Sequence, residues 1–143
     1  MKKLITLLLC CLPFLVCAQT DEKYLEGAIT FKDGKVTFST EMTVPAMTKE
    51  QIYETLLDWS KERFQPTEKM NARILFQNPE EGSIAIGGEE YLVFSSTALA
   101  LDRTRIYYQL KLFCETGKCD IEMTRIRYWY NETRDGGEKY DAE

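Results

Sequence analysis

Histidine is absent from all 143 residues of the chain. Its absence excludes serine–histidine and cysteine–histidine nucleophile systems, and it removes both the usual general base and the commonest metal ligand. The segment IGGEE at 86–90 has two glycines, but it lacks the lysine and the spacing of a phosphate-binding loop. We therefore expect a protein that is not an enzyme and that holds no metal or cofactor.

Basic residues are also in deficit. The chain has 18 lysines and arginines against 23 aspartates and glutamates, with a formal net charge of −5 at pH 7. Loss of Lys2 and Lys3 with an N-terminal leader would leave 16 basic against 23 acidic residues, and a charge of −7. Nucleic acids and anionic membrane surfaces attract basic proteins, so we expect neither as a partner.

Long apolar runs are missing outside the first 18 residues. The chain starts with Lys2 and Lys3, continues with an apolar run over 4–16, and then has two small residues, Cys17 and Ala18. This order is typical of a secretory signal peptide, and the run is shorter than the roughly 20 residues that span a membrane. We expect export to the periplasm or the medium, with no transmembrane segment in the mature chain.

The expected cleavage point lies after Ala18, which makes residues 1–18 the signal peptide and the polar residues 19–27 a flexible N-terminal segment. The alternative is a lipoprotein in which Cys17 carries the lipid. A lipidated cysteine normally follows a small residue, and Val16 fits that position poorly. We therefore favour cleavage after Ala18.

Cysteine is scarce once the leader is removed, because Cys10, Cys11 and Cys17 leave with it and only Cys114 and Cys119 remain. Two cysteines cannot complete a structural zinc site, which needs four ligands. Their spacing of four intervening residues lies within a strand pattern, whereas a thioredoxin-type motif has two and opens a helix. A structural role is the simpler interpretation.

The stretch FCETGKCD at 113–120 suits a β-hairpin with the loop Glu115–Lys118, in which Gly117 takes the left-handed conformation. Cys114 and Cys119 would then be directly opposed and within reach of a disulfide. We predict that disulfide, which closes a short loop and contributes about 2 kcal/mol. The same register pairs Leu112 with Ile121, Leu110 with Met123, and Lys111 with Glu122.

A hairpin and a helix are predicted in the first half. Asp33-Gly34 is a strong two-residue turn signal, and it places Phe31 opposite Val36. The stretch VPAMTKEQIYETLLDWSKERF at 44–64 reads as a helix that begins with a Thr48–Gln51 capping box. Its apolar stripe is expected to lie on a sheet; the stripe consists of Ile52, Leu56, Trp59 and Arg63, with Tyr53, Leu57 and Phe64 beside it.

The second half has the period of two that indicates strands. ARILFQ and SIAIGGEEYLVFSS flank the turn NPEEG, a pairing that would set Phe76 opposite Ile84 and Ile74 opposite Ile86. Gly87-Gly88 suggests a bulge or a bend, and 97–102 is either a bend or a single helical turn. Two long strands then run over 103–114 and 119–130. This pattern predicts one α+β domain over residues 28–131, followed by a polar tail at 132–143.

The hairpin register meets a conflict after Thr124. Continued without a break, it would place Arg125 and Arg127 on the apolar face of the sheet. Either a bulge near Thr124 returns Ile126 and the tyrosines after it to the core, or the arginines emerge at the end of the sheet. The sequence leaves both alternatives open.

One cluster is a candidate partner-binding face, because aromatic side chains with arginines suit a protein or a carbohydrate partner. The alternative is a half-exposed sheet face with cross-strand tyrosine–arginine pairs. A second kind of site, for a small apolar ligand, would be a pocket between helix and sheet lined by Trp59 and Tyr53. The candidate face consists of Arg103, Arg105, Tyr107, Arg125, Arg127, Tyr128, Trp129 and Tyr130.

The chain resembles a family of exported bacterial proteins known as a domain of unknown function with a TBP-like (TATA-binding-protein-like) fold. The resemblance spans residues 27–131 and is carried by the leader, by DGKVTFSTEMTVPAMTKEQIYETLLDWSKERF and by GGEEYLVFSSTALALDRTRIYYQLKLFCETGKCDIEMTRIRYWY. It implies a curled antiparallel sheet of about five strands with one long helix packed on one face. It also implies a C-terminal helix, which this chain, ending at Glu143, would truncate.

The resemblance carries no catalytic residues. Together with the composition, it leads us to expect a non-enzymatic binding or interaction module of the bacterial cell envelope, with an envelope protein or a glycan as its unidentified partner. The alternative is a carrier of small apolar ligands.

Overall fold

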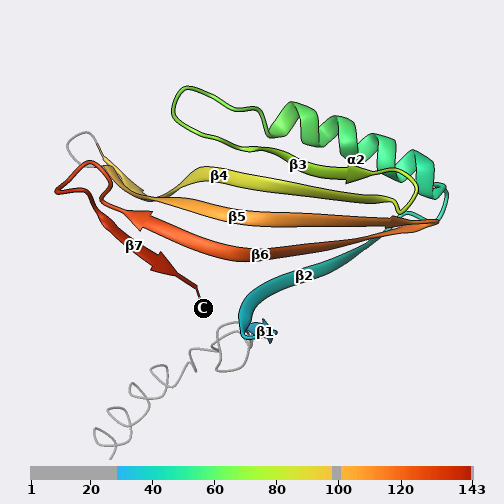
Figure 1. Cartoon of the computed structure of the whole chain (residues 1–143), viewed down its shortest axis with the longest axis horizontal. Helices are drawn as coiled ribbons and strands as arrows, with labels where there is room; N and C mark the ends of the chain where they lie inside the picture. Colours follow the sequence, from blue (N-terminus) through green and yellow to red (C-terminus); the bar gives the residue numbers. More distant parts are fainter. Residues whose placement is uncertain (1–28, 98–100, 143) are drawn as a thin grey trace, which may run out of the picture.

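The computed structural model describes residues 29–97 and 101–142. They form one antiparallel sheet with a single helix at one end of it, an α+β architecture (Figure 1). The strands lie in the order β1-β2-β6-β5-β4-β3, and β7 also pairs with β6. The elements are β1 (Thr30–Lys32), β2 (Lys35–Thr43), α2 (Lys49–Arg63), β3 (Arg73–Asn78), β4 (Ser83–Ser96), β5 (Leu101–Glu115), β6 (Lys118–Tyr130) and β7 (Glu138–Asp141).

The β1–β2 hairpin forms at the predicted turn. Asp33 and Gly34 both have positive φ, +54° and +75°, as a turn matching the twist of its strands requires. Phe31 lies opposite Val36, which confirms the predicted register. The predicted leader and flexible segment lie outside the described residues.

Helix α2 begins at the predicted capping box. The backbone N–H of Gln51 donates to Thr48 Oγ1 at 3.3 Å, and the Thr48 N–H donates to Gln51 Oε1 at 2.9 Å. The predicted stripe is wrong at Trp59, which is 44% exposed, while Ser60 beside it is fully buried. The small Ser60 side chain bonds back to the Leu56 carbonyl at 2.6 Å and lets the helix lie close to the sheet.

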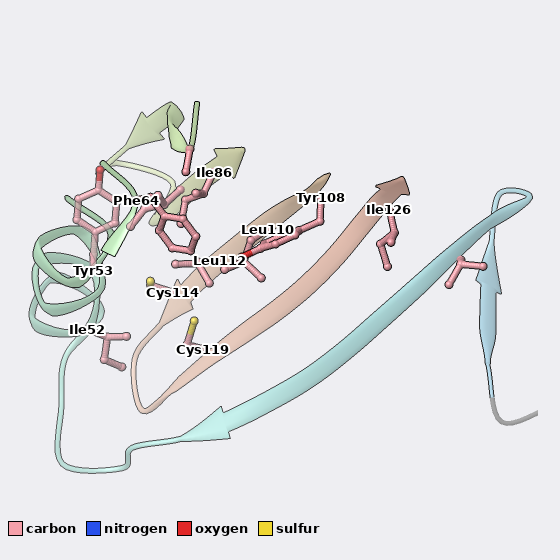
Figure 2. Packing of buried hydrophobic residues seen from close by; sticks show 13 residues of the cluster. Ile52, Tyr53, Phe64, Ile86, Tyr108, Leu110, Leu112, Cys114, Cys119 and Ile126 are labelled. Carbon is pink, nitrogen blue, oxygen red and sulfur yellow. The ribbon is translucent and has the colours of Figure 1, made fainter. Parts of the chain in front are cut away.

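The core lies between α2 and one end of the sheet, where the β5–β6 turn also lies (Figures 1 and 2). Its centre consists of side chains that are at most 2% exposed: Ile52, Ile84, Ile86, Leu112, Cys114 and Cys119. Even-numbered residues of β5 face α2 because successive side chains of a strand point to opposite faces. The odd-numbered residues of β5 therefore face away from the helix.

Cys114 and Cys119 are opposed across β5 and β6, as the predicted register requires. Both are buried free thiols in this structure, and burial raises the pKa of the Cys114 thiol to about 12. The disulfide between them stays a prediction. Glu115 pairs with Lys118, so the connecting turn has two residues and not the predicted four, and Gly117 takes a positive φ of +80° within it.

The predicted β3–β4 pairing is confirmed at Ile74 and Ile86. After Ile74 the register of the two strands changes by one residue. Phe76 lies opposite Ala85 instead of the predicted Ile84, because the irregularity sits in β3 after Ile74. Of the two alternatives at Gly87-Gly88, the bulge is wrong, since β4 pairs regularly with β5 there. Gly88 serves packing instead: the ring of Tyr108 occupies the space that a Cβ at residue 88 would fill.

A bulge in β6 resolves the register conflict after Thr124. Gln109 pairs with Thr124 but Tyr107 pairs with Arg127, so β6 carries one residue more than β5 between these pairs. Arg125 is the extra residue and has a φ of +54°. Beyond it, Ile126 points into the core and is 3% exposed. The first of the two alternatives is therefore confirmed.

Residues 132–143 were expected to be a polar tail outside the domain, but Glu138–Asp141 adds a strand to the sheet. Strands β2 and β7 pair with the same strand in succession: β2 with Lys118–Met123 of β6, and β7 with Arg127–Tyr130. In the described part of the chain the sheet thus has seven strands, where about five were expected. Residues 98–100, part of the predicted bend or helical turn, lie outside the described residues, and Leu101 and Asp102 already belong to β5.

The packing at Gly88 gives a direct test of the fold. Gly88→Ala should lower the free energy of unfolding by about 2–3 kcal/mol, because the new methyl group overlaps the Tyr108 ring. Gly87→Ala is the matched control; its Cβ would lie 3.4 Å from the Leu75 side chain, an ordinary contact, so we expect little change. Urea unfolding of both variants measures the difference, and equal stabilities would contradict the packing.

Candidate functional site

The sheet face turned away from α2, which we call the open face, holds most of the predicted cluster. Arg103, Arg105 and Tyr107 point to it from β5, and cross-strand pairing brings Trp129 opposite Arg105 and Arg127 opposite Tyr107. These five side chains were predicted to lie together, and the structure places them together.

Two predicted members of the cluster point to the other face of the sheet, although Tyr128 also borders the hollow described below. Tyr128 pairs with Ile106 and packs against the core on the helix side, and Tyr130 pairs with Thr104 on that same side. The one-residue shift of the bulge is the cause, because it exchanges the faces of all later residues of β6. Arg125 occupies the bulge itself, with an exposed side chain.

Arg105 is the centre of a nearly buried ion network. Its Nη1 lies 2.6 Å from Glu89 Oε1, its Nε lies 2.6 Å from Glu132 Oε2, and these three side chains are only 12–13% exposed. Nη1 also donates to the Lys69 carbonyl at 2.6 Å, and Nη2 donates to the Tyr91 hydroxyl at 2.9 Å. Arg105 therefore joins β4, β5, the loop before β3 and the turn before β7, and four of its five N–H donors are occupied.

Arg103 makes a cation–π contact with an aromatic ring. Its guanidinium carbon lies 3.7 Å from the centre of the Tyr91 ring, and Arg105 lies 5.1 Å from the same ring. The Tyr91 hydroxyl in turn donates to Glu132. Glu89, Tyr91 and Glu132 were missed from the sequence; only the period of two, which puts 89 and 91 on the face of Arg105, could have pointed to the first two.

Beside this network lies a hollow of about 300 Å³, which we call the aromatic groove. Two exposed cations lie over two rings there: Arg127 is 5.6 Å from the centre of Tyr107, and Lys139 is 4.7 Å from that of Trp129. The Trp129 indole N–H donates to the Gly136 carbonyl at 2.9 Å, which fixes the ring. Asp141 completes the rim with a carboxylate.

The alternative site between helix and sheet finds less support. Tyr53 is buried among core side chains (Figure 2), and Trp59 is 44% exposed and packs edge-on against Phe64 at 5.4 Å. Within residues 29–97 and 101–142, no helix is long and apolar enough to cross a membrane. The same residues hold no group of three or more acidic or cysteine side chains placed to bind a metal ion.

The sheet order and the one helix that the described residues pack on its face define a TBP-like α+β domain. Residues 38–129 match the family described as a domain of unknown function (DUF4468) with TBP-like fold, and the chain belongs to that family. No function is assigned to the family. Comparison with curated proteins gives no match.

Two solved structures are similar to this chain. A DUF4468 family protein from Bacteroides ovatus ATCC 8483 is 43% identical, with a TM-score of 0.74 over 84% of this chain and 68% of that one. A TBP-like protein from Parabacteroides distasonis ATCC 8503 is 23% identical, with a TM-score of 0.66 over 79% of this chain and 69% of that one. The second likeness shows the fold alone.

The Arg105 network should act in stability and not in binding. Arg105→Gln is expected to lower the free energy of unfolding by about 2–4 kcal/mol, because it leaves two nearly buried carboxylates without a counter-charge. Arg127→Gln, at an exposed arginine, should change it by less than about 0.5 kcal/mol. Urea unfolding at pH 7 compares them, and equal effects would contradict the assigned roles.

The same network should appear in the pH dependence of stability. The hydrogen bond from Arg105 holds the pKa of Glu132 below its usual value of 4.5. A carboxyl with a lowered pKa in the folded chain stabilises the fold above its unfolded pKa, and that contribution disappears as the pH falls through the folded one. Stability should therefore decline on acidification below pH 4.5, and Glu132→Gln should make that decline shallower.

Proposed function

We propose that this protein is an exported binding module of the bacterial cell envelope, without enzymatic activity, and that its aromatic groove holds a glycan. The observation that carries the proposal is the pair of rings, Tyr107 and Trp129, set on neighbouring strands beside a hollow with charged groups at its rim. Export rests on the leader-like first 18 residues.

The chemistry of the groove supports a saccharide. Aromatic faces offer a rigid apolar surface, and the cations and the carboxylate at the rim can hydrogen-bond hydroxyl groups. A volume of about 300 Å³ is at the small end of ligand sites, which span roughly 300–1,000 Å³. Trp129 is held in place by Gly136, so little side-chain entropy is lost when a ligand stacks on it.

The likeness to TATA-binding protein in the family description concerns the fold, and fold does not determine function. The acidic balance of the chain, 23 acidic against 18 basic residues, speaks against nucleic acid as the partner. We therefore place the ligand among the glycans of the envelope, with an envelope protein as the alternative outcome of the test.

Tryptophan fluorescence tests the proposal, because the chain has only two tryptophans. In a Trp59→Phe background all tryptophan emission comes from Trp129, and a panel of bacterial envelope oligosaccharides should change it in a saturable way. Tyr107→Ala should weaken the binding by about tenfold, because a large apolar side chain contributes about 1.5–3 kcal/mol when fully buried and this ring would be covered on one side.

Phe113→Ala is the matched control, an exposed ring on the open face outside the groove, and it should leave binding unchanged. If no saccharide changes the Trp129 emission, the glycan proposal is wrong. Binding of an envelope protein that is insensitive to Tyr107→Ala would show that the function lies on another surface.

A further inference from the structure

A second hollow of the open face adjoins the aromatic groove. It has a volume of about 250 Å³ and shares Tyr107 and Arg127 with the groove. Arg73 of β3 and Arg125 of the β6 bulge also line it, and Gly87 leaves room for it because no side chain projects there. Three arginines from two separate parts of the chain therefore border one hollow.

These three arginines form no ion pair within residues 29–97 and 101–142. Asp141 is the cross-strand neighbour of Arg127, but its carboxylate is not within salt-bridge distance. Arg105 shows the contrast, with two carboxylates at 2.6 Å. Glu89 also lines the hollow, but its carboxylate is already paired with Arg105. In a chain with more acidic than basic residues, three unpaired arginines around one hollow leave it positively charged.

Arg125 adds a second, independent observation. Its φ of +54° lies in the left-handed region, which costs free energy for any residue except glycine. Glycine at this position would form the same bulge without that cost. Non-glycine residues held in such conformations cluster at functional sites, and here the strained backbone sets an arginine at the rim of the hollow.

We propose that the open face binds an acidic saccharide, with the sugar ring on Tyr107 and Trp129 and its carboxylate or phosphate among Arg73, Arg125 and Arg127. This inference rests on the glycan-binding function proposed above, and it names the ligand class. Guanidinium groups present planar forks of donors that match the oxygens of carboxylates and phosphates. The neighbouring aromatic rings would contact the apolar face of the sugar, and an inorganic anion has no such face.

Matched pairs of probes separate the two proposals. Trigalacturonate and its methyl ester share one sugar skeleton but differ in charge, and glucose 6-phosphate and glucose form the phosphate pair. Titrations use the full chain with Trp59→Phe and follow the emission of Trp129. In at least one pair the charged probe should bind about tenfold tighter or more, the effect of one charge-assisted hydrogen bond.

The variant Arg73→Gln should reduce the affinity for the charged probe to near that of its neutral partner and leave the neutral probe unaffected. Arg73→Lys should restore part of the difference. Arg134→Gln removes one positive charge in the turn before β7, outside both hollows, and should change neither affinity.

The outcomes are distinguishable. If the charged and the neutral probe of each pair bind equally well, the acidic-saccharide inference is overturned while glycan binding by the groove stands. If no probe of either pair binds but a member of the oligosaccharide panel does, only the acidic-saccharide inference fails. If neither the probes nor the panel bind, both proposals fail. A charged preference that survives Arg73→Gln and Arg125→Gln together would also overturn the inference, because it would place the anion elsewhere.

Discussion

The bulge at Arg125 is the constraint on which the rest of the sheet depends. The first half of β6 must turn Cys119 towards the helix, and the second half must turn Ile126 towards the same core. These positions are an odd number of residues apart, so a regular strand with a period of two cannot satisfy both. One extra residue in β6 reconciles them, at the cost of a left-handed backbone at a non-glycine position.

The same shift assembles the open face. It sets Trp129 opposite Arg105 and Arg127 opposite Tyr107, which creates the aromatic groove beside the buried ion network. The network and the groove consist of neighbouring side chains, but these side chains make different contacts. Arg105 is occupied by carboxylates and ties strands and turns together, whereas Arg127 keeps an exposed guanidinium over a ring. Arginines that look alike in the sequence therefore differ in the structure: one is ion-paired and nearly buried, and the other is exposed.

What the sequence could predict was local. The Asp33-Gly34 turn and the Thr48–Gln51 capping box each depend on residues at most three positions apart, and both formed as expected. The exposure of Trp59 and the strand in the tail depend on contacts between distant segments, and neither was foreseen. Of the candidate site, the alternation of side chains along β5 correctly predicted which residues of that strand lie together on the open face. The faces of Tyr128 and Tyr130 could not be assigned, because they depend on where the bulge lies.

The central claim is that Arg125 absorbs the register change of β6 in a left-handed conformation, and unfolding free energies test it most directly. Arg125→Gly should be as stable as the natural chain or up to about 1 kcal/mol more stable, since glycine adopts positive φ without strain. Arg125→Val should be less stable by about 1–3 kcal/mol, whereas Arg127→Val, at a regular strand position, should be tolerated. An Arg125→Val variant as stable as Arg125→Gly would contradict the account.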